Sequence, residues 1–274
     1  MVKSPQLIPH GGTKRQGAEQ QGLAATLQRK NAIFRDAIWD MQTFRHRGHD
    51  VVKTNEIEQD GQFLLKAGTR KKAVLSNRRL RVEEHENFPH VLVFFDNRPN
   101  MQVLVIQENT AAFFSPRTVA RMIQDNANTV LNDDNLECVI LPQFDENEFW
   151  KYVQQHRNRI VRVHFEIMAP NLPRISESIP EAFNALQRDV GSQSAKLELQ
   201  SLPNGTLALQ PSNPTVNGLA KAAADGGGNI KVRLKNYNSW KRMSKAPKEV
   251  SIGQFDAEGA PDKVLKALND VIGN

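Results

Sequence analysis

The sequence has little cysteine, no long apolar run and no internal repeat. Cys138 is the single cysteine in 274 residues, which excludes an internal disulfide and a cysteine-rich zinc site and is typical of a reducing compartment. No stretch approaches the roughly 20 apolar residues that a membrane-spanning helix needs. The first residues also lack the apolar segment of a signal peptide. We therefore expect a cytoplasmic globular protein.

Positive charge is in excess over the whole chain. Lys and Arg number 36 against 30 Asp and Glu, which gives a net charge of +6 and a pI near 9.5. This balance favours an acidic partner, with nucleic acid first and an anionic membrane surface second. A hydrophobic content of 39% suffices for a buried core, and the length allows one large domain or two of ordinary size.

The N-terminal half predicts a mixture of helices and strands. Residues 1–18 are rich in Gly, Pro and basic residues without any period, which predicts a flexible basic arm. An apolar stripe from Leu23 to Met41 predicts a helix over about 19–45. Ser115 and Asp145 have the spacing of helix N-caps. Short apolar runs between turn residues predict strands at 63–65, 73–75, 91–95, 101–106 and 138–141. Residues 19–157 are therefore predicted to be an N-terminal α+β region.

The C-terminal half, residues 158–274, has the order strand, helix, strand, strand, helix, strand. Strands are expected at 160–166, 196–199, 206–209 and 229–235, with helices at 178–190 and from Pro214 to the glycines at 226–228. Asn204-Gly205 predicts a hairpin between the second and third strands. An extra strand at 250–252 and a terminal helix follow. We therefore predict an α+β fold in which a strand-rich half precedes a ferredoxin-like βαββαβ domain.

The last strand of this plan alternates strictly between apolar and basic residues. Its apolar residues can face a core while its basic residues line the other side of the sheet. First and last strands are neighbours in a ferredoxin-like sheet, so basic residues of both would share one face. That face would hold Arg162, His164, Lys231, Arg233 and Lys235. Like charges so close repel. A phosphate backbone would explain them, and a solvated face neutralised by Glu166 or Glu198 is the other interpretation.

Two further groups of basic residues stand out. The stretch from Lys66 to Arg81 contains no acidic residue, so it could follow a nucleic-acid backbone or protect an edge hairpin from aggregation. The other group surrounds Trp240, where a base could stack, although a loop tryptophan more often anchors its loop. The candidate nucleic-acid-binding residues are Lys71, Lys72, Arg78, Arg79, Arg81, Arg162, Lys231, Arg233, Lys235, Lys241 and Arg242.

The face would lack the outward aromatic residues with which RNA-recognition modules stack bases, so duplex backbone binding fits better. Enzyme signatures are weak as well. The histidines at 46, 49, 85 and 90 lack zinc-type spacing with further ligands, and a helix cap accounts for Asp145 and Glu148. Cys138 is predicted to be an inert core residue. We therefore predict no catalytic residue, no metal and no cofactor.

The order of elements resembles that of RexA-like proteins of phage exclusion, and KwaB-like proteins of the Kiwa defence system are similar in plan. The shared features are an N-terminal helix, a strand-rich half with an exposed hairpin, and a long strand such as Ile160–Glu166 leading into an α/β half. The resemblance implies a homodimer that binds double-stranded DNA without sequence preference and works with a membrane protein or a second defence component. A metal-dependent nuclease with dispersed carboxylates and a basic assembly protein bound to an acidic protein are the alternatives.

Overall fold

The computed structural model describes residues 2–9, 29–76, 78–98, 101–168, 194–225, 228–244, 248–250 and 258–273. They form a mixed α/β structure that is rich in strands. The chain divides into two compact units, one made of Pro5–Ile140 and Val250–Asn274 and the other of Val2–Ser4 and Leu141–Glu249. The terminal helix therefore belongs with the N-terminal unit, whereas the sequence grouped it with residues 158–274.

The first unit is built on a seven-stranded sheet with the order β2-β3-β4-β7-β8-β1-β9. Two of its hairpins turn at Arg47-Gly48 and Asp60-Gly61, where all four residues have positive φ. Such two-residue turns match the twist of the strands that they join. The strands are β1 (Val2–Pro9), β2 (Thr43–His46), β3 (His49–Gln59), β4 (Gln62–Gly68), β7 (His90–Asp96), β8 (Val103–Ile106) and β9 (Leu136–Pro142).

The N-terminal residues correct two predictions. Residues 2–9 form strand β1 between β8 and β9 rather than a flexible arm, because the backbone hydrogen bonds of a sheet come from neighbours distant in sequence. The predicted helix 19–45 is helical at 29–39, and its expected end overlaps β2. Residues 10–28, the predicted helix 178–190 and the predicted strand residues 251–252 lie outside the described part.

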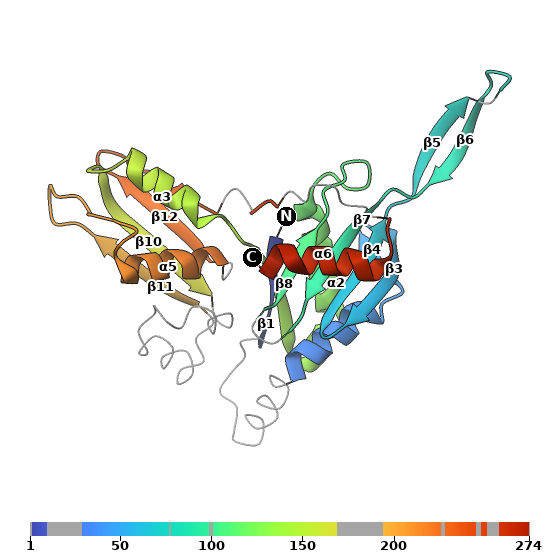
Figure 1. Ribbon diagram of the computed structural model, residues 1–274, viewed down its shortest axis with the longest axis horizontal. Helices are drawn as coiled ribbons and strands as arrows, with labels where there is room; N and C mark the ends of the chain where they lie inside the picture. The colour runs from blue at the N-terminus through green and yellow to red at the C-terminus, as the bar shows by residue number, and fades with distance from the viewer. Residues whose placement is uncertain are drawn as a thin grey trace. The chain divides into compact units, whose positions relative to one another are not determined.

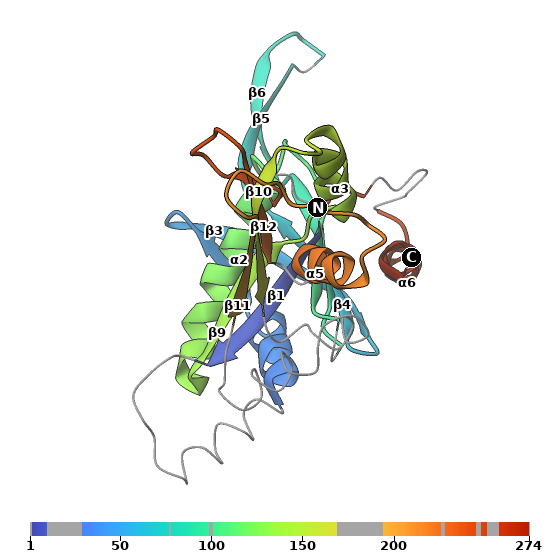
Figure 2. The same cartoon turned by 90° about the vertical axis from the view of Figure 1, so that its left-hand side faces the viewer.

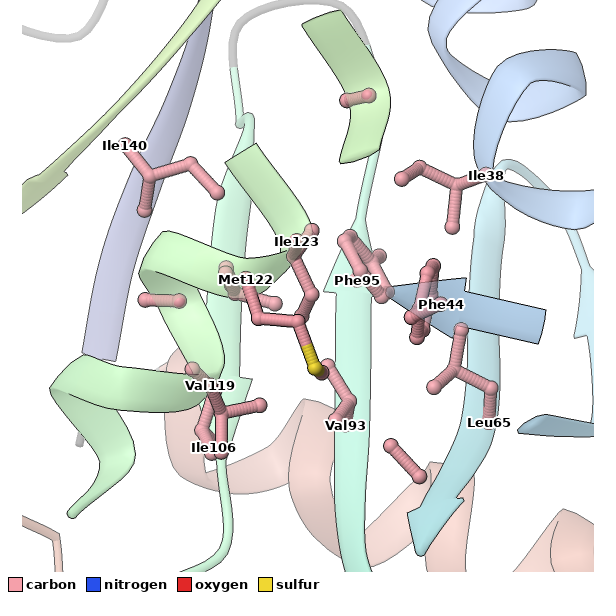
Figure 3. Close-up of a cluster of buried hydrophobic side chains, with 14 of the residues drawn as sticks. Ile38, Phe44, Leu65, Val93, Phe95, Ile106, Val119, Met122, Ile123 and Ile140 are labelled. Atoms are coloured by element: carbon pink, nitrogen blue, oxygen red, sulfur yellow. The ribbon is translucent and has the colours of Figure 1, made fainter. Parts of the chain in front are cut away.

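Helix α2 (Pro116–Leu131) fills the concave side of this sheet. Its N-cap is Ser115, whose Oγ accepts from Thr118 N, with Pro116 in the first turn, as the sequence predicted. Figure 3 shows its side chains Val119, Met122 and Ile123 packed against apolar residues of the strands and of the helix 29–39. Burial of this stripe against the sheet contributes to the hydrophobic driving force for folding of the unit.

Two asparagines of α2 reach both edges of the sheet. Asn126 donates to Arg45 O and accepts from Arg45 N, each at 2.8 Å, on edge strand β2. Asn128 accepts from Cys138 N at 2.6 Å and donates to Cys138 O at 3.0 Å on edge strand β9. The sheet therefore curls around α2, and part of the backbone at each edge is satisfied by side chains rather than left for another chain.

The opposite face of the sheet is covered by helix α6 (Pro261–Gly273). Val264, Leu265 and Leu268 form a second buried cluster with Leu64, Leu92 and Phe94. Just before the helix, Glu258 pairs with Lys66 at 3.0 Å and with His90 at 2.9 Å. An amphipathic helix must cover some apolar surface, but its sequence does not say which one.

The second unit is a four-stranded antiparallel sheet with the order β11-β10-β12-β13. Helices α3 (Glu146–Gln155) and α5 (Pro214–Asp225) pack on one face of it. The predicted cap Asp145 accepts a backbone N–H group at the start of α3, and Asn213 accepts two at the start of α5, just before the predicted first residue Pro214. The strands are β10 (Ile160–Met168), β11 (Ser194–Gln200), β12 (Asn229–Leu234) and β13 (Lys241–Arg242).

The pairing in this unit differs partly from the predicted plan. β10 and β12 are antiparallel neighbours, as first and last strands should be. However, residues 206–209 are not a strand, and β10 pairs directly with β11 instead. Asn204 does adopt the positive φ of a turn, with Gly205 N donating to Leu202 O at 2.9 Å. The local turn signal therefore predicted the reversal, while the pairing partner was decided by tertiary structure.

Strands β5 (Lys71–Ser76) and β6 (Val82–Asn87) form a separate two-stranded sheet. This β5–β6 ribbon extends away from the seven-stranded sheet in both views (Figures 1 and 2). Of its two strands, only the first was predicted from the sequence, at residues 73–75. No helix in the described part of the chain combines the length and the apolar character needed to cross a membrane.

Candidate nucleic-acid interface

The outer face of the four-stranded sheet carries a group of cations from three strands. Val163, Phe165, Ile230 and Val232 are buried beneath α3 and α5. Because side chains alternate along a strand, the residues between them must point to the other side. We call this surface the basic face, and it consists of Arg162, His164, Lys231, Arg233 and Arg242.

Strand register brings these side chains into two rows. Arg162 lies opposite Arg233 across β10 and β12. In the next row His164 lies opposite Lys231, and Lys231 lies opposite Arg242 of β13. Neighbouring strands are about 4.8 Å apart, so each row places basic side chains at the closest spacing that a sheet allows. The sequence predicted that the first two of these strands are neighbours, and the structure shows their register.

In the described part of this sheet, the acidic residues near the basic face lie on β10 and β11. Glu198 of β11 pairs with Arg162 at 3.4 Å, and Glu166 pairs with Lys196 at 3.5 Å. Among the described residues, Lys231, Arg233 and Arg242 form no ion pair with an acidic side chain. The face is therefore balanced near β11 and increasingly positive toward β12 and β13.

The loop after β12 is anchored on the same surface. Arg233 donates from Nε to Tyr237 O at 3.0 Å and from Nη2 to Asn238 Oδ1 at 3.2 Å. The Trp240 ring meets the His164 ring edge-on, with centroids 6.4 Å apart. Trp240 thus anchors its loop, as the more common of its two interpretations predicted.

A pocket of about 430 Å³ lies at the end of the first row. Its lining includes Arg162, Arg233 and Lys235, together with polar loop residues around Asn204 and Asn238. Lys235 itself is exposed just beyond β12, with Nζ 3.5 Å from Asn204 O. Three cations around an open hollow can accommodate an anion of phosphate size.

The remaining predicted residues of this unit are placed differently. Lys241 lies opposite Val232, so its side chain leaves the edge strand on the helix side, away from the basic face. The sequence placed Arg242 in a loop, but it is part of β13. The signal for this strand was the alternation of exposed Arg242 with buried Met243, which is too short to recognise without its partner strand.

The β5–β6 ribbon corrects the interpretation of Lys66–Arg81 as uncompensated charge. Lys72 pairs with Glu84 at 2.6 Å, and Arg70 pairs with Glu86. Lys71 donates to Ala111 O, and Lys66 pairs with Glu258. The acidic residues come from β6 and from the segment before α6, so Lys66, Arg70 and Lys72 have acidic partners that are distant in sequence. Arg78, Arg79 and Arg81 lie exposed at the ribbon tip, in the first unit.

Other potential reactive groups have structural roles. Within the described ranges, no three His, Cys, Asp or Glu side chains gather into a possible metal site. Burial raises the pKa of the Cys138 thiol, which removes the thiolate that nucleophilic chemistry requires. Burial, and then the neighbouring Asp225, raise the pKa of Glu146 at the start of α3.

No family model, curated protein or solved structure matches this chain. The likeness to RexA-like and KwaB-like proteins, drawn from the order of elements, therefore stays a prediction.

Proposed function

We propose that the protein binds double-stranded DNA without base preference, with the basic face against the phosphate backbone. The observation that carries the proposal is the position of Lys231 between His164 and Arg242 in one row across three strands. Like charges directly opposite each other destabilise a sheet. A polyanion placed over them attracts both charges and so offsets their mutual repulsion. Neutralised phosphates also release counterions, which adds to affinity.

The spacing of the row favours a continuous backbone over an isolated anion. Strands about 4.8 Å apart present cations at intervals comparable to the ~3.4 Å per charge along one DNA strand. Arg162 and Arg233 add a second row and line the pocket of about 430 Å³, where one phosphate would meet two guanidinium groups. Such contacts fix position without reading sequence.

Duplex is favoured over single-stranded nucleic acid because the described aromatic residues beside this surface, Trp240 and Tyr237, each contact a neighbouring side chain. Trp240 packs against His164, and Tyr237 lies beside the Arg159 guanidinium at 5.7 Å. Single-strand binders depend on stacking of bases on such rings. Binding of single-stranded DNA or RNA would therefore be weaker at equal salt.

The finer fold and the biological context are part of the same proposal. A ferredoxin-like plan for residues 158–274 is supported by β10 and β12 as antiparallel neighbours, whereas the direct pairing of β10 with β11 departs from it. A homodimer in phage defence, acting with a membrane protein or a second defence component, rests on the resemblance in element order.

The test is a fluorescence-anisotropy titration of duplex DNA, single-stranded DNA and RNA at roughly 50 to 200 mM salt. The key variant is Lys231→Ala with Arg242→Ala, which leaves the Arg233 contacts to the loop intact. The matched control is Lys151→Ala with Lys221→Ala, because both lysines are exposed on α3 and α5 on the other side of the sheet. Both variants remove two positive charges from the same unit.

We expect the first variant to lose about tenfold or more in duplex affinity and to lower the salt slope by roughly two, with the control unchanged. Equal losses of duplex affinity in the two variants would show that binding depends on net charge alone, which would contradict the proposal. Plasmid nicking that depends on magnesium or manganese would instead indicate the nuclease alternative. Discrete oligomers that form regardless of DNA, without duplex binding, would indicate the assembly protein.

A further inference from the structure

The β5–β6 ribbon separates its charges between shaft and tip. Along the shaft, Arg70 pairs with Glu86 and Lys72 pairs with Glu84, whereas Lys71 donates to Ala111 O. At the tip, three arginines lie within four residues. The tip consists of Arg78, Arg79, Leu80 and Arg81, all of them exposed. The ribbon therefore has ion pairs along its shaft and three exposed arginines at its tip.

Leu80 is the unusual residue of this tip. Its side chain is 85% exposed, and its backbone has a φ of 57°. Glycine and asparagine adopt this left-handed conformation readily, whereas a bulky side chain adopts it at a cost. Exposure and backbone conformation both disfavour leucine here for the stability of the chain alone. Strain of this kind collects at functional positions.

The ribbon is also built to project. Each strand has six residues, which corresponds to a length of about 20 Å. Every side chain of its two strands is exposed except the half-buried Ala73, and Figure 1 shows the ribbon extending beyond the seven-stranded sheet. Two strands without a core are marginally stable in water, so the ribbon would gain stability from a partner.

We propose that the ribbon tip enters the minor groove of duplex DNA, where Leu80 wedges between base pairs and bends the duplex. This inference rests on the proposed function. The three arginines would bind the groove and its flanking phosphates, because a narrow minor groove attracts arginine. An apolar side chain pushed into a base step unstacks it and kinks the helix by roughly 20 to 90°. Two-stranded ribbons are among the elements that proteins place in DNA grooves.

Charge favours DNA over protein as the partner of the tip. Three guanidinium groups buried against a protein would each need a carboxylate or several carbonyl groups, whereas phosphates flank a minor groove throughout. The rival is pairing of the ribbon with a second copy through the exposed Val74, Leu75 and Val82. That protein–protein contact would involve the shaft, whereas the proposed DNA contact involves the tip, so substitutions can distinguish the two.

The experiment measures energy transfer between dyes at the ends of a duplex of roughly 30 base pairs, with the full-length protein at saturation. Leu80→Asn removes the apolar side chain but suits the positive φ, so the tip should keep its shape. Leu80→Met keeps an unbranched apolar wedge. Leu75→Thr is the matched control, because Leu75 is an exposed leucine on the shaft and threonine is favourable in strands.

We expect the wild type, Leu80→Met and Leu75→Thr to shorten the distance between the duplex ends. Leu80→Asn should abolish the shortening while affinity changes by less than about threefold, because phosphate contacts supply most of the affinity. Bending that survives in Leu80→Asn, or a wild type that binds without bending, would overturn the wedge. Loss of bending in Leu75→Thr, together with a change in sedimentation of that variant in the absence of DNA, would also overturn it, in favour of pairing through the shaft.

Failure of this inference can be told apart from failure of the proposed function. A protein that binds duplex through Lys231 and Arg242 but leaves it straight contradicts only the wedge. A wild type without any duplex affinity contradicts both. Loss of bending in Leu80→Asn together with loss of affinity in the Lys231 and Arg242 variant supports both surfaces as separate contacts.

Discussion

Lys231 of β12 and Arg242 of β13 lie directly opposite each other, with their side chains on the same face of the sheet. His164 occupies the position on the other side of Lys231. Opposed like charges cost about 0.2–1 kcal/mol relative to neutral pairs. A chain selected for stability alone would place a carboxylate at one of these positions, as it does on β11, where Glu198 lies opposite His164 and pairs with Arg162.

The first prediction concerns this stability cost. Lys231→Thr should raise the free energy of unfolding by about 0.5 kcal/mol at low salt, because it removes the repulsion and suits a strand. The gain should shrink as salt screens the charges, and duplex affinity should fall. Urea unfolding at two ionic strengths together with anisotropy titrations would measure both effects. A variant that is less stable than the wild type at low salt would show that Lys231 is a structural residue.

The second prediction is a pH dependence at Glu258. Hydrogen bonds from Lys66 and then from His90 hold the pKa of its carboxyl group below its usual value. A lowered pKa in the folded state adds stability that is present above the unfolded-state pKa and is lost as pH falls through the folded-state pKa. Because the carboxylate is largely exposed, Glu258→Gln should cost only about 0.5 kcal/mol at pH 7.

That difference should shrink below about pH 4.5 and vanish at lower pH, where both proteins lack the charge. Thermal unfolding of the two proteins across this range would test it. Glu249→Gln is the control, because Glu249 is an exposed glutamate of the other unit. A cost for Glu258→Gln that does not depend on pH would mean that the ion pairs contribute nothing.

The third prediction concerns the edge of the seven-stranded sheet. Asn128→Ala should lower the free energy of unfolding by about 2 kcal/mol, because it leaves the N–H and C=O of buried Cys138 without their partner. Asn128→Asp keeps the acceptor for Cys138 N but turns a carboxylate oxygen toward Cys138 O, so it should also destabilise. Denaturant unfolding would measure these costs. A loss below about 0.5 kcal/mol for Asn128→Ala would show that water replaces the amide.

The fourth prediction concerns the terminal helix. Leu265→Ala should cost about 2–4 kcal/mol, because Leu265 is buried against the seven-stranded sheet. Lys266→Ala, on the exposed side of the same helix, should change stability by less than about 0.5 kcal/mol. Hydrogen exchange should show that the loss of protection in Leu265→Ala falls on β4 and β7. Loss confined to residues 141–249 would contradict the assignment of α6 to the first unit.

Much of the fold was readable locally. Ser115, Asp145 and Asn213 predicted three helix starts because a cap is an interaction between residues two or three positions apart. The alternation in β12 predicted which of its residues would be buried, because side-chain direction along a strand is a property of the strand itself. The pairing of Arg162 with Arg233 was not predicted, because the register of β10 and β12 shifts between Ile160 and Arg162.

The sequence by itself determined the caps, the turns, the alternation of β12 and the cations available for a polyanion. Only the tertiary structure decided that residues 2–9 form a strand, that β11 pairs with β10, that α6 returns to the first unit and that Glu84 and Glu86 neutralise the base of the ribbon. Backbone ladders, helix docking and cross-strand ion pairs join residues far apart in the chain. Their energies depend on which surfaces meet, and no local pattern of residues encodes that choice.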